Sequence, residues 1–387
     1  MRIAFFYFVY FAAVGILLPY LPPHYKALGF NGKAIAVLGS LTSVASVFVP
    51  LAWGWLADRA RRPTLLFKLA CAGAAVAFAP LLWARSFAAV AVAVAGFSVF
   101  YTPITSLADS VAVVEARRLR TDYARLRLWG SAGFVASSYL FGAWLARGGA
   151  APDAVPAALA LLAGAAVAVL LVRPVTVPLA GPTFADARRL ATDPALLCFL
   201  LAGTLHWAAA APFHMLFAIH LRDLGVDARW VGTGLALAVS AEVAVMYAFR
   251  RLAARLPLFA LLAVAFIASA VRWTVVARAA DGRVLAAIQL LHGLGFGAFF
   301  VASIAHLERA VPEALRATGR ALFASLVFGA GGLAGNVLAG TLYDAGGGRL
   351  AYAAAAALEL AAPLLLWGSA HVARARAAAA VQAAAER

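Results

Sequence analysis

Arg125-Leu126-Arg127-Leu128-Trp129-Gly130-Ser131-Ala132-Gly133-Phe134 is the stretch in which a basic segment runs directly into an apolar one. Gly130 and Gly133 leave one helix face without bulk, which favours close helix packing, while Trp129 and Phe134 offer flat rings for stacking. If the apolar part crosses a membrane, Arg127 carries its charge to a depth where an unpaired charge is costly. The stretch therefore predicts a membrane helix whose arginine has a partner or a function.

The composition of the chain is that of a membrane protein. Of its 387 residues, 65% are hydrophobic and 12% are charged, and the mean hydropathy is +0.91, whereas soluble domains contain roughly 25% charged residues. The formal net charge of +16 does not indicate nucleic-acid binding, because the charges form short clusters between apolar runs. Cys71 and Cys198 lie within such runs without metal-ligand spacing, so we expect no metal, no cofactor and no disulfide framework.

The apolar runs, each about 20 residues long, predict an all-α integral membrane protein with twelve transmembrane helices. The predicted spans are residues 3–22, 34–56, 64–83, 88–112, 124–146, 155–172, 195–220, 229–249, 257–277, 284–305, 318–342 and 350–369. The first run is too long for a signal peptide, and prolines occupy the place of a cleavage site. With this topology, 22 of the 32 Lys and Arg residues fall on the side of the termini and 9 on the other. The positive-inside rule therefore predicts that both termini are cytoplasmic.

The connection at residues 173–194 divides the predicted spans into two halves. It contains four prolines and a short basic amphipathic segment, residues 184–190, which we expect to lie along the inner membrane surface. Residues 1–172 then form an N-terminal six-helix bundle and residues 195–369 a C-terminal one, and residues 370–387 form a cytoplasmic helical tail. Two halves with similar basic turns after their second spans suggest duplication, which is the architecture of many secondary transporters.

Three acidic residues fall within the predicted spans: Asp109, Glu242 and Glu359. Asp109 and Arg127 are equally far from the middle of the inner loop between their spans, so an antiparallel hairpin places them at the same depth. Either residue alone is compatible with a snorkelling charge at a helix end. The matched depth favours an interacting pair.

Charged residues recur in consecutive spans of the second half. Glu242 lies about 12 Å from the inner end of its span, while Arg272 and His292 lie about 7 and 12 Å from the outer ends of theirs. A structural salt bridge between Glu242 and Arg272 is one interpretation. Because three ionisable groups exceed what packing requires, we favour a proton-coupling site.

Polar residues near His292 predict a cavity wall. Gln289 lies one helical turn from His292, and Gly293 and Gly295 remove bulk around it. His206 and His214, eight residues apart, are weaker candidates for a second part of the same pocket, together with Trp207 and Phe213. Glu359 faces an Ala-rich last span, and we interpret it as structural or interfacial.

The turn after the second span carries a more specific pattern. It resembles the Gly-x-Leu-Ala-Asp-Arg-x-Gly-Arg-Lys signature of the major facilitator superfamily, keeping Gly54, Leu56, Ala57, Asp58, Arg59, Arg62 and Leu66. Arg61 and Pro63 replace the second glycine and the lysine. Gly54, Asp58, Arg59 and Arg62 are expected to act as a conformational latch, because Asp58 is not explained by a positive-inside cluster that only sets orientation.

The charged residues extend this resemblance across all the predicted spans. Residues 127–134, Asp109, Glu242, Arg272 and Leu291-His292 resemble the lactose permease group of proton symporters, and Pro19-Tyr20-Leu21-Pro22 and Gln289-Leu290-Leu291-His292 resemble its phenylpropionate permease-like branch. The resemblance implies a bacterial inner-membrane protein that works as a monomer. It implies that Arg127 and Glu242 bind substrate, that Phe134 stacks on it, that Asp109 positions Arg127, and that Arg272 and His292 belong to the proton-coupling network. From the residues themselves we add Trp129 and Gln289 to the substrate site, and Asp109 and Glu242 to the proton-coupling residues.

Two departures from that pattern change the expected substrate and proton carrier. The sugar permease pattern has a glutamate three positions after the histidine and a lysine three before it, where this chain has Gly295 and Gln289. Either Glu242 or Asp109 then carries the proton, with His292 as relay, or coupling is of another kind. A small aromatic carboxylic acid fits better than lactose, because an arginine can bind a carboxylate with two parallel hydrogen bonds.

The sequence thus predicts a secondary active transporter that takes up a small organic solute together with a proton by alternating access. A proton-coupled exporter of the same fold and a symporter for a sugar or nucleoside remain alternatives. A membrane-embedded enzyme would need a nucleophile and base or a metal site, and the sequence contains no such pattern.

Overall fold

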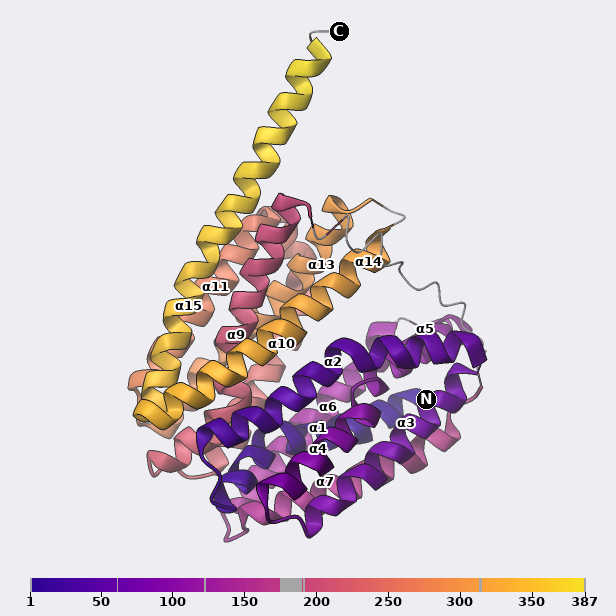
Figure 1. Ribbon diagram of the computed structural model, residues 1–387, viewed down its shortest axis with the longest axis vertical. Coiled ribbons are helices and arrows are strands. Elements are labelled where there is room, and N and C mark those ends of the chain that lie inside the picture. The colour runs from indigo at the N-terminus through magenta and orange to yellow at the C-terminus, as the bar shows by residue number, and fades with distance from the viewer. Residues whose placement is uncertain are drawn as a thin grey trace.

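The computed structural model describes residues 2–60, 62–121, 123–174, 190, 192–312 and 315–385. Every regular element in this part of the chain is helical, which confirms the predicted all-α class. The helices form two bundles that lie against each other, with the N-terminal half in indigo to magenta and the C-terminal half in rose to yellow (Figure 1). The predicted amphipathic segment 184–190 lies, apart from Leu190, outside the described residues.

The described part of the N-terminal half contains seven α-helices, of which α4 and α5 together form one longer unit. They are α1 (Arg2–Ala27), α2 (Gly32–Ala60), α3 (Pro63–Phe78), α4 (Phe87–Tyr101), α5 (Ile104–Arg118), α6 (Tyr123–Leu145) and α7 (Ala154–Ala168). Pro80 helps to change α3 into the 3-10 helix η1 (Ala79–Leu82), and α7 continues the 3-10 helix η2 (Ala151–Asp153) and leads into η3 (Val169–Leu171). Pro103 interrupts α4 and α5, because proline lacks the amide proton that a continuous helix needs.

The C-terminal half is less regular. Its α-helices are α9 (Pro194–Asp223), α10 (Arg229–Arg255), α11 (Leu258–Arg278), α12 (Gly282–Ala287), α13 (Phe299–Ala310), α14 (Arg316–Phe323) and α15 (Gly331–Ala385). Between α12 and α13 lie the 3-10 helix η4 (Ile288–Leu291) and the π-helix η5 (Gly293–Ala298), and a second π-helix, η7 (Ala324–Ala330), joins α14 to α15. Helix α15 breaks at Gly346 and Gly347; the latter has φ +69°, which glycine adopts without steric cost.

Within the described residues, ten helices or helical series are long and apolar enough to cross a membrane. One of them, Gly319–Val372, contains the break at Gly347. Helix α6, which has 23 residues and packs between α1 and α10, is not among the ten. The structure thus shows a multi-pass membrane protein, while the count of twelve spans and the side on which the termini lie stay predictions.

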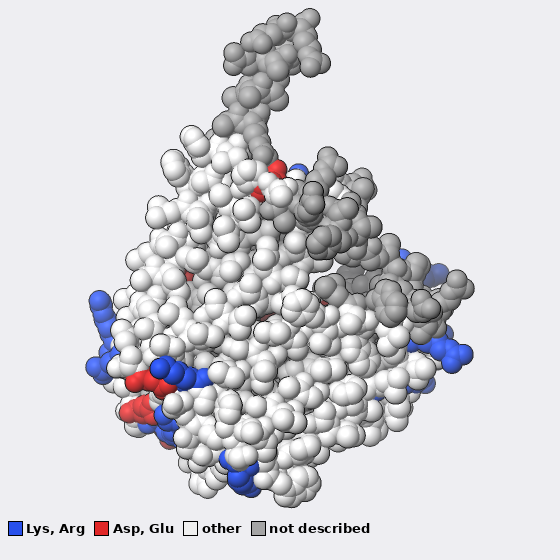
Figure 2. All heavy atoms as spheres, in the orientation of Figure 1, with Lys and Arg blue, Asp and Glu red and all other residues white. Residues whose placement is uncertain are grey.

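The surface agrees with a membrane environment. Lys and Arg side chains gather at opposite ends of the visible face, and the broad belt between them is almost free of charge (Figure 2). Large apolar side chains are exposed on this protein, for example Val76 at 74% and Val92 at 73%. Such exposure stabilises a protein in lipid, whereas in water it would drive aggregation.

The two halves make close contact at the end where α2 begins and α15 breaks, and they diverge towards α5 and α14 (Figure 1). There the backbone amide of Gly32 donates to Asp344 Oδ1 over 2.6 Å. A side chain added to Gly142 of α6 would lie 3.2 Å from the backbone of Gly232 in α10, so these helices nearly touch. In the predicted orientation this is the outer end, and the structure is a state closed on that side.

Only part of the predicted latch can be placed. Gly54, Asp58 and Arg59 lie in the helical backbone of α2, but their surroundings fall outside what the structure describes. Arg62 is exposed and directly precedes α3. The latch therefore stays a prediction.

Candidate functional site

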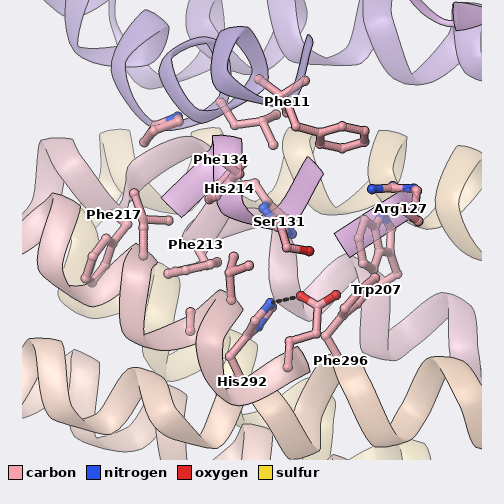
Figure 3. A pocket seen from close by; sticks show the side chains of 17 residues that line it. Phe11, Arg127, Ser131, Phe134, Trp207, Phe213, His214, Phe217, His292 and Phe296 are labelled. Atoms are coloured by element: carbon pink, nitrogen blue, oxygen red, sulfur yellow. Dashed lines mark ion pairs between the residues drawn. The ribbon is translucent and has the colours of Figure 1, made fainter. Parts of the chain in front are cut away.

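A cavity of about 270 Å³ lies between the two halves. Four of the predicted site residues line it: Arg127 and Phe134 of α6, Glu242 of α10, and His292, which lies between η4 and η5. Aromatic side chains from both halves form much of the remaining wall, as Figure 3 shows; they are Phe11, Trp207, Phe213, Phe217 and Phe296. The cavity thus joins opposite charges from opposite halves in an aromatic enclosure.

Helix α6 presents Arg127, Ser131 and Phe134 to the cavity. Their spacing of four and three residues places them on one helical face. Trp129, two residues after Arg127, points to another face, is 50% exposed and contacts Phe8 with ring centroids 6.5 Å apart. Trp129 does not line this cavity, because a shift of two residues turns a side chain about 200° around the helix, and its contact with substrate stays a prediction.

The glycines that follow Arg127 have the packing role expected of them. A side chain at Gly133 would overlap the backbone carbonyl of Phe8, and one at Gly15 would lie 2.7 Å from the Phe134 oxygen. The backbones of α1 and α6 are therefore in direct contact. This contact brings the rings of α1 to Arg127.

Arg127 is held by an anionic and an aromatic neighbour. Its Nε lies 3.8 Å from Asp109 Oδ1, and Asp109 also accepts a 2.5 Å hydrogen bond from the Tyr7 hydroxyl. The guanidinium lies over Phe11, 4.0 Å from the ring centroid. At 3.8 Å the ion pair is an electrostatic contact without a short hydrogen bond, so Arg127 keeps donors for a further anion.

In the C-terminal half, four predicted residues form one polar chain. Glu242 Oε2 lies 3.6 Å from His292 Nε2, the pair that Figure 3 marks with a dashed line. His292 Nδ1 lies 3.0 Å from Arg272 Nη1, and Arg272 Nε donates to Gln289 Oε1 over 2.7 Å. His292 therefore separates Glu242 from Arg272, and the direct salt bridge that was one interpretation does not form.

The hydrogen bonds of this chain fix the tautomer of His292. An arginine can only donate, so His292 Nδ1 accepts from Arg272 and the ring proton lies on Nε2, facing Glu242. Arg272 and Gln289 are buried behind the cavity wall, with Arg272 stacked on Phe213 at 4.0 Å. Gln289 therefore orients Arg272 here and does not reach the cavity, contrary to the prediction that it binds substrate.

A buried pair that the sequence did not indicate lies behind the same wall. His206 Nδ1 is 2.8 Å from Glu359 Oε2, and His206 Nε2 is 2.8 Å from the carbonyl oxygen of Gly295 in η5. Glu359 also accepts a hydrogen bond from Trp273 Nε1 and is 0% exposed. Glu359 is thus structural and not interfacial.

The two histidines of α9 separate in the structure. His214 lines the cavity with Trp207 and Phe213, but His206 is bonded to Glu359 and does not. Eight residues correspond to 800° of helical rotation, so the rings differ by about 80° in direction. The prediction that both histidines line one pocket is correct for His214 only.

The π-helix η5 gives the second half its close contacts. A side chain at Gly293 would lie 2.6 Å from the Ala241 oxygen of α10, and one at Gly295 would overlap the Ser269 hydroxyl of α11. An acid at position 295 has no space in this packing. The sequence signal that could have drawn attention to this segment is the repeated glycine at positions 293, 295 and 297. The segment is a π-helix in the structure, and π-helical turns occur often at functional sites.

Comparison with known proteins agrees with this architecture. The model of the MFS_1 like family matches residues 1–354. Among curated proteins, the maltose permease of Geobacillus stearothermophilus is 29% identical over 333 residues, covering 84% of this chain and 83% of the relative. The probable 3-phenylpropionic acid transporter of Escherichia coli is 27% identical over 346 residues, covering 87% and 89%.

Solved structures share the fold at low sequence identity. The crystal structure of the nucleoside transporter NupG aligns with a TM-score of 0.83 and 16% identity, covering 96% of this chain and 98% of that one. A bacterial homologue of the human lysosomal transporter Spinster, in an inward-facing and unoccupied conformation, aligns with a TM-score of 0.70. The match to the family model, carried by a fold of two helical bundles around a shared cavity, shows that this chain belongs to the MFS_1 like family of membrane transporters.

Proposed function

We propose that this transporter takes up a small aromatic carboxylic acid together with a proton. One observation carries the proposal: Arg127 of one half and Glu242 of the other line the same aromatic cavity. An arginine recognises a carboxylate through parallel hydrogen bonds, and aromatic walls accept a ring by stacking. In this account Arg127 binds the carboxylate while Phe11 and Phe134 contact the ring.

Glu242 supplies the proton site in this account. A carboxylate near the middle of a membrane is costly unless it is paired or neutralised, and its neighbour His292 is oriented by Arg272. Protonation of Glu242 removes a negative charge from the cavity that receives the anionic substrate. Solute and proton then enter together as a neutral load, and the halves rock to release them on the other side.

The lining of the cavity argues against a sugar. A sugar needs many hydrogen-bonding groups, because each unpaired hydroxyl that leaves water is unfavourable. The described wall of this cavity is mostly aromatic and aliphatic, with polar groups concentrated at Arg127, Ser131, His214, Glu242 and His292. The relative named a probable 3-phenylpropionic acid transporter therefore suggests a closer substrate class than the relative named a maltose permease.

Proteoliposomes that contain the purified protein test this proposal. An inward proton gradient should drive accumulation of labelled 3-phenylpropionate in right-side-out vesicles, and a proton uncoupler should abolish it. Accumulation under an outward proton gradient, and not under an inward one, would support a proton-coupled exporter instead. Binding of neither phenylpropionate nor related aromatic acids, together with binding of maltose or a nucleoside, would overturn the proposed substrate class.

A further inference from the structure

A second cavity of about 380 Å³ adjoins the first between the two halves. It is lined by α1, α2, α4 and the junction of α3 with η1 in the N-terminal half, and by α9, η7 and α15 in the C-terminal half. Leu18, Trp207 and His214 line both cavities. The two spaces therefore share a boundary formed by α1 and α9.

The boundary between the two cavities is not closed by side chains at Leu18. Leu18 lies in the middle of α1, where neighbouring residues are buried, yet it is 41% exposed. Trp207 and His214 stack against each other with ring centroids 5.3 Å apart and form the opposite edge. A ligand that rests on Leu18 can thus extend from one cavity into the other.

The second cavity differs from the first in its charge. No Lys, Arg, Asp or Glu side chain occurs among the described residues that line it. Its serine and threonine hydroxyl groups have partners in the protein: Thr42 pairs with Ser98 at 2.9 Å, and Ser46 donates to the Thr42 carbonyl at 2.8 Å. Asn336 donates to the Ser43 hydroxyl at 3.3 Å. This cavity therefore suits an apolar group better than a polar one.

Size gives an independent argument. Pockets that hold drug-sized ligands measure roughly 300–1,000 Å³, and the first cavity, at about 270 Å³, falls just below that range. A substrate with its carboxylate at Arg127 and a body larger than one ring needs the second cavity as well. The charged compartment and the neutral compartment together match an amphipathic molecule.

From these observations we infer that the second cavity is a binding subsite for the apolar body of the substrate. The preferred aromatic monocarboxylic acids are then those whose apolar part is larger than one ring, with the carboxylate at Arg127 and the rest of the apolar part crossing Leu18 towards α2. This inference rests on the proposed function, because it takes the position of the carboxylate from it.

A homologous series of acids tests the inference by equilibrium binding to the purified transporter. The probes are phenylacetate, phenylpropionate, phenylbutyrate and phenyloctanoate. Burying one methylene group contributes about 0.8 kcal/mol, which corresponds to about fourfold in affinity. Affinity should therefore rise about fourfold with each methylene along the series, until the second cavity is filled.

Ser46→Trp provides the discriminating variant. Ser46 is exposed and lines only the second cavity, so a tryptophan there fills the subsite without overlapping a packed core. The variant should bind phenylacetate as the wild type does and lose at least tenfold in affinity for phenyloctanoate. Val44→Trp places the same tryptophan on α2 at an exposed residue that lines neither cavity. This variant should bind each acid of the series with the wild-type affinity.

The outcomes separate the subsite from the proposed function. The subsite is refuted if the affinity does not increase with chain length beyond phenylpropionate. It is also refuted if the affinity increases with chain length as much in Ser46→Trp as in the wild type. In both cases the carboxylate site stands. If Arg127→Lys binds the whole series as tightly as the wild type, the carboxylate site fails and the subsite fails with it. Unchanged phenylacetate binding shows that Ser46→Trp is folded. Ser46→Leu repeats the test with a smaller apolar side chain in the second cavity.

Discussion

At the scale of single residues, charge and distance decide which groups act on the solute. Arg127 lies in the cavity with only a long contact to Asp109, whereas Arg272 is buried behind the wall and bonded to Gln289 and His292. The two arginines therefore have different tasks. Arg127 is free to recognise an anion, and Arg272 holds the imidazole that faces Glu242.

Substituting Arg127→Lys should reduce the uptake of aromatic acids by about ten- to a hundredfold. Lysine keeps the charge but loses the planar pair of donors, and a hydrogen bond to a charged group contributes roughly 1.5–3 kcal/mol. Initial rates in proteoliposomes, normalised to the amount of inserted protein, measure the effect. Uptake at the wild-type rate would remove Arg127 from the binding site.

Substituting Glu242→Gln should separate exchange from accumulation. Glutamine imitates the protonated acid, so a loaded transporter can still exchange solute, but no proton can be released. Counterflow should persist, while the accumulation ratio under a proton gradient should fall to about one. Accumulation at the wild-type level would show that another group carries the proton.

Sequence reasoning found these residues because the depth of a charge in a membrane helix can be counted along the chain. That reasoning paired Asp109 with Arg127 and grouped Glu242, Arg272 and His292 in one site, without showing that His292 lies between the other two. It missed that Trp129 and His206 lie on other helix faces than Arg127 and His214, although offsets of two and eight residues along a helix already indicate this. Glu359 was missed as the partner of His206 because 153 positions separate them in the chain, and no single segment encodes which distant helices pack together.

At the scale of elements, close helix contacts fix the positions of these charges. Helices α1 and α6 touch at Gly133, and η5 touches α10 at Gly293. The sequence indicated Gly133 as a packing position, whereas it predicted a cavity wall around Gly293, which in the structure packs against Ala241 of α10. It did not indicate which helices would meet there, nor that residues 293–298 would form a π-helix.

Substituting Gly133→Ala should lower thermal stability, because the added methyl group would overlap the Phe8 carbonyl. Overpacking of this kind costs about 1–3 kcal/mol. Gly96→Ala is the matched control, since Gly96 lies within a helix and its added methyl group would meet open space. A fluorescence melting curve should show a lower Tm for Gly133→Ala only, and equal melting of both variants would refute the close contact.

The pair His206 and Glu359 should act as a neutral support for η5. His206 Nε2 must donate to the Gly295 carbonyl, so one proton is shared between His206 Nδ1 and Glu359. Glu359→Gln keeps a donor for His206 and an acceptor for Trp273, and it should retain proton-driven uptake with an unchanged pH profile. Glu359→Leu should raise the KM for the solute several-fold and lower the Tm.

A loss of accumulation in Glu359→Gln, with exchange retained, would contradict this role. That result would show that Glu359 releases its proton during transport. Assays of Glu242→Gln and Glu359→Gln under the same gradient therefore distinguish the carrier from the support.

At the scale of the whole molecule, contacts between the halves determine which side is closed. The larger apolar core includes residues of both halves, whereas the second core is confined to the C-terminal half and its connection. Asp344 adds hydrogen bonds from the amides of Gly32 and Lys33 across the interface. These contacts stabilise the closed outer end in the predicted orientation.

Substituting Asp344→Ala should therefore shift the population towards a state open at this end. Spin labels at Arg85 and Arg283, exposed residues near this end of the two halves, should show an additional, longer distance in a chain without Cys71 and Cys198. Asp153→Ala is the control, because Asp153 bonds only Ala150 of its own connection among the hydrogen bonds described. Identical distance distributions in wild type and Asp344→Ala would refute the closing role.

The movement of protons with solute tests the central claim most directly. Weakly buffered right-side-out proteoliposomes at equal pH on both sides receive an aromatic acid from outside, and the external pH is recorded. The account predicts alkalinisation of the medium that follows solute entry with wild-type protein and is absent with Glu242→Gln. Solute entry without any change in external pH would contradict it.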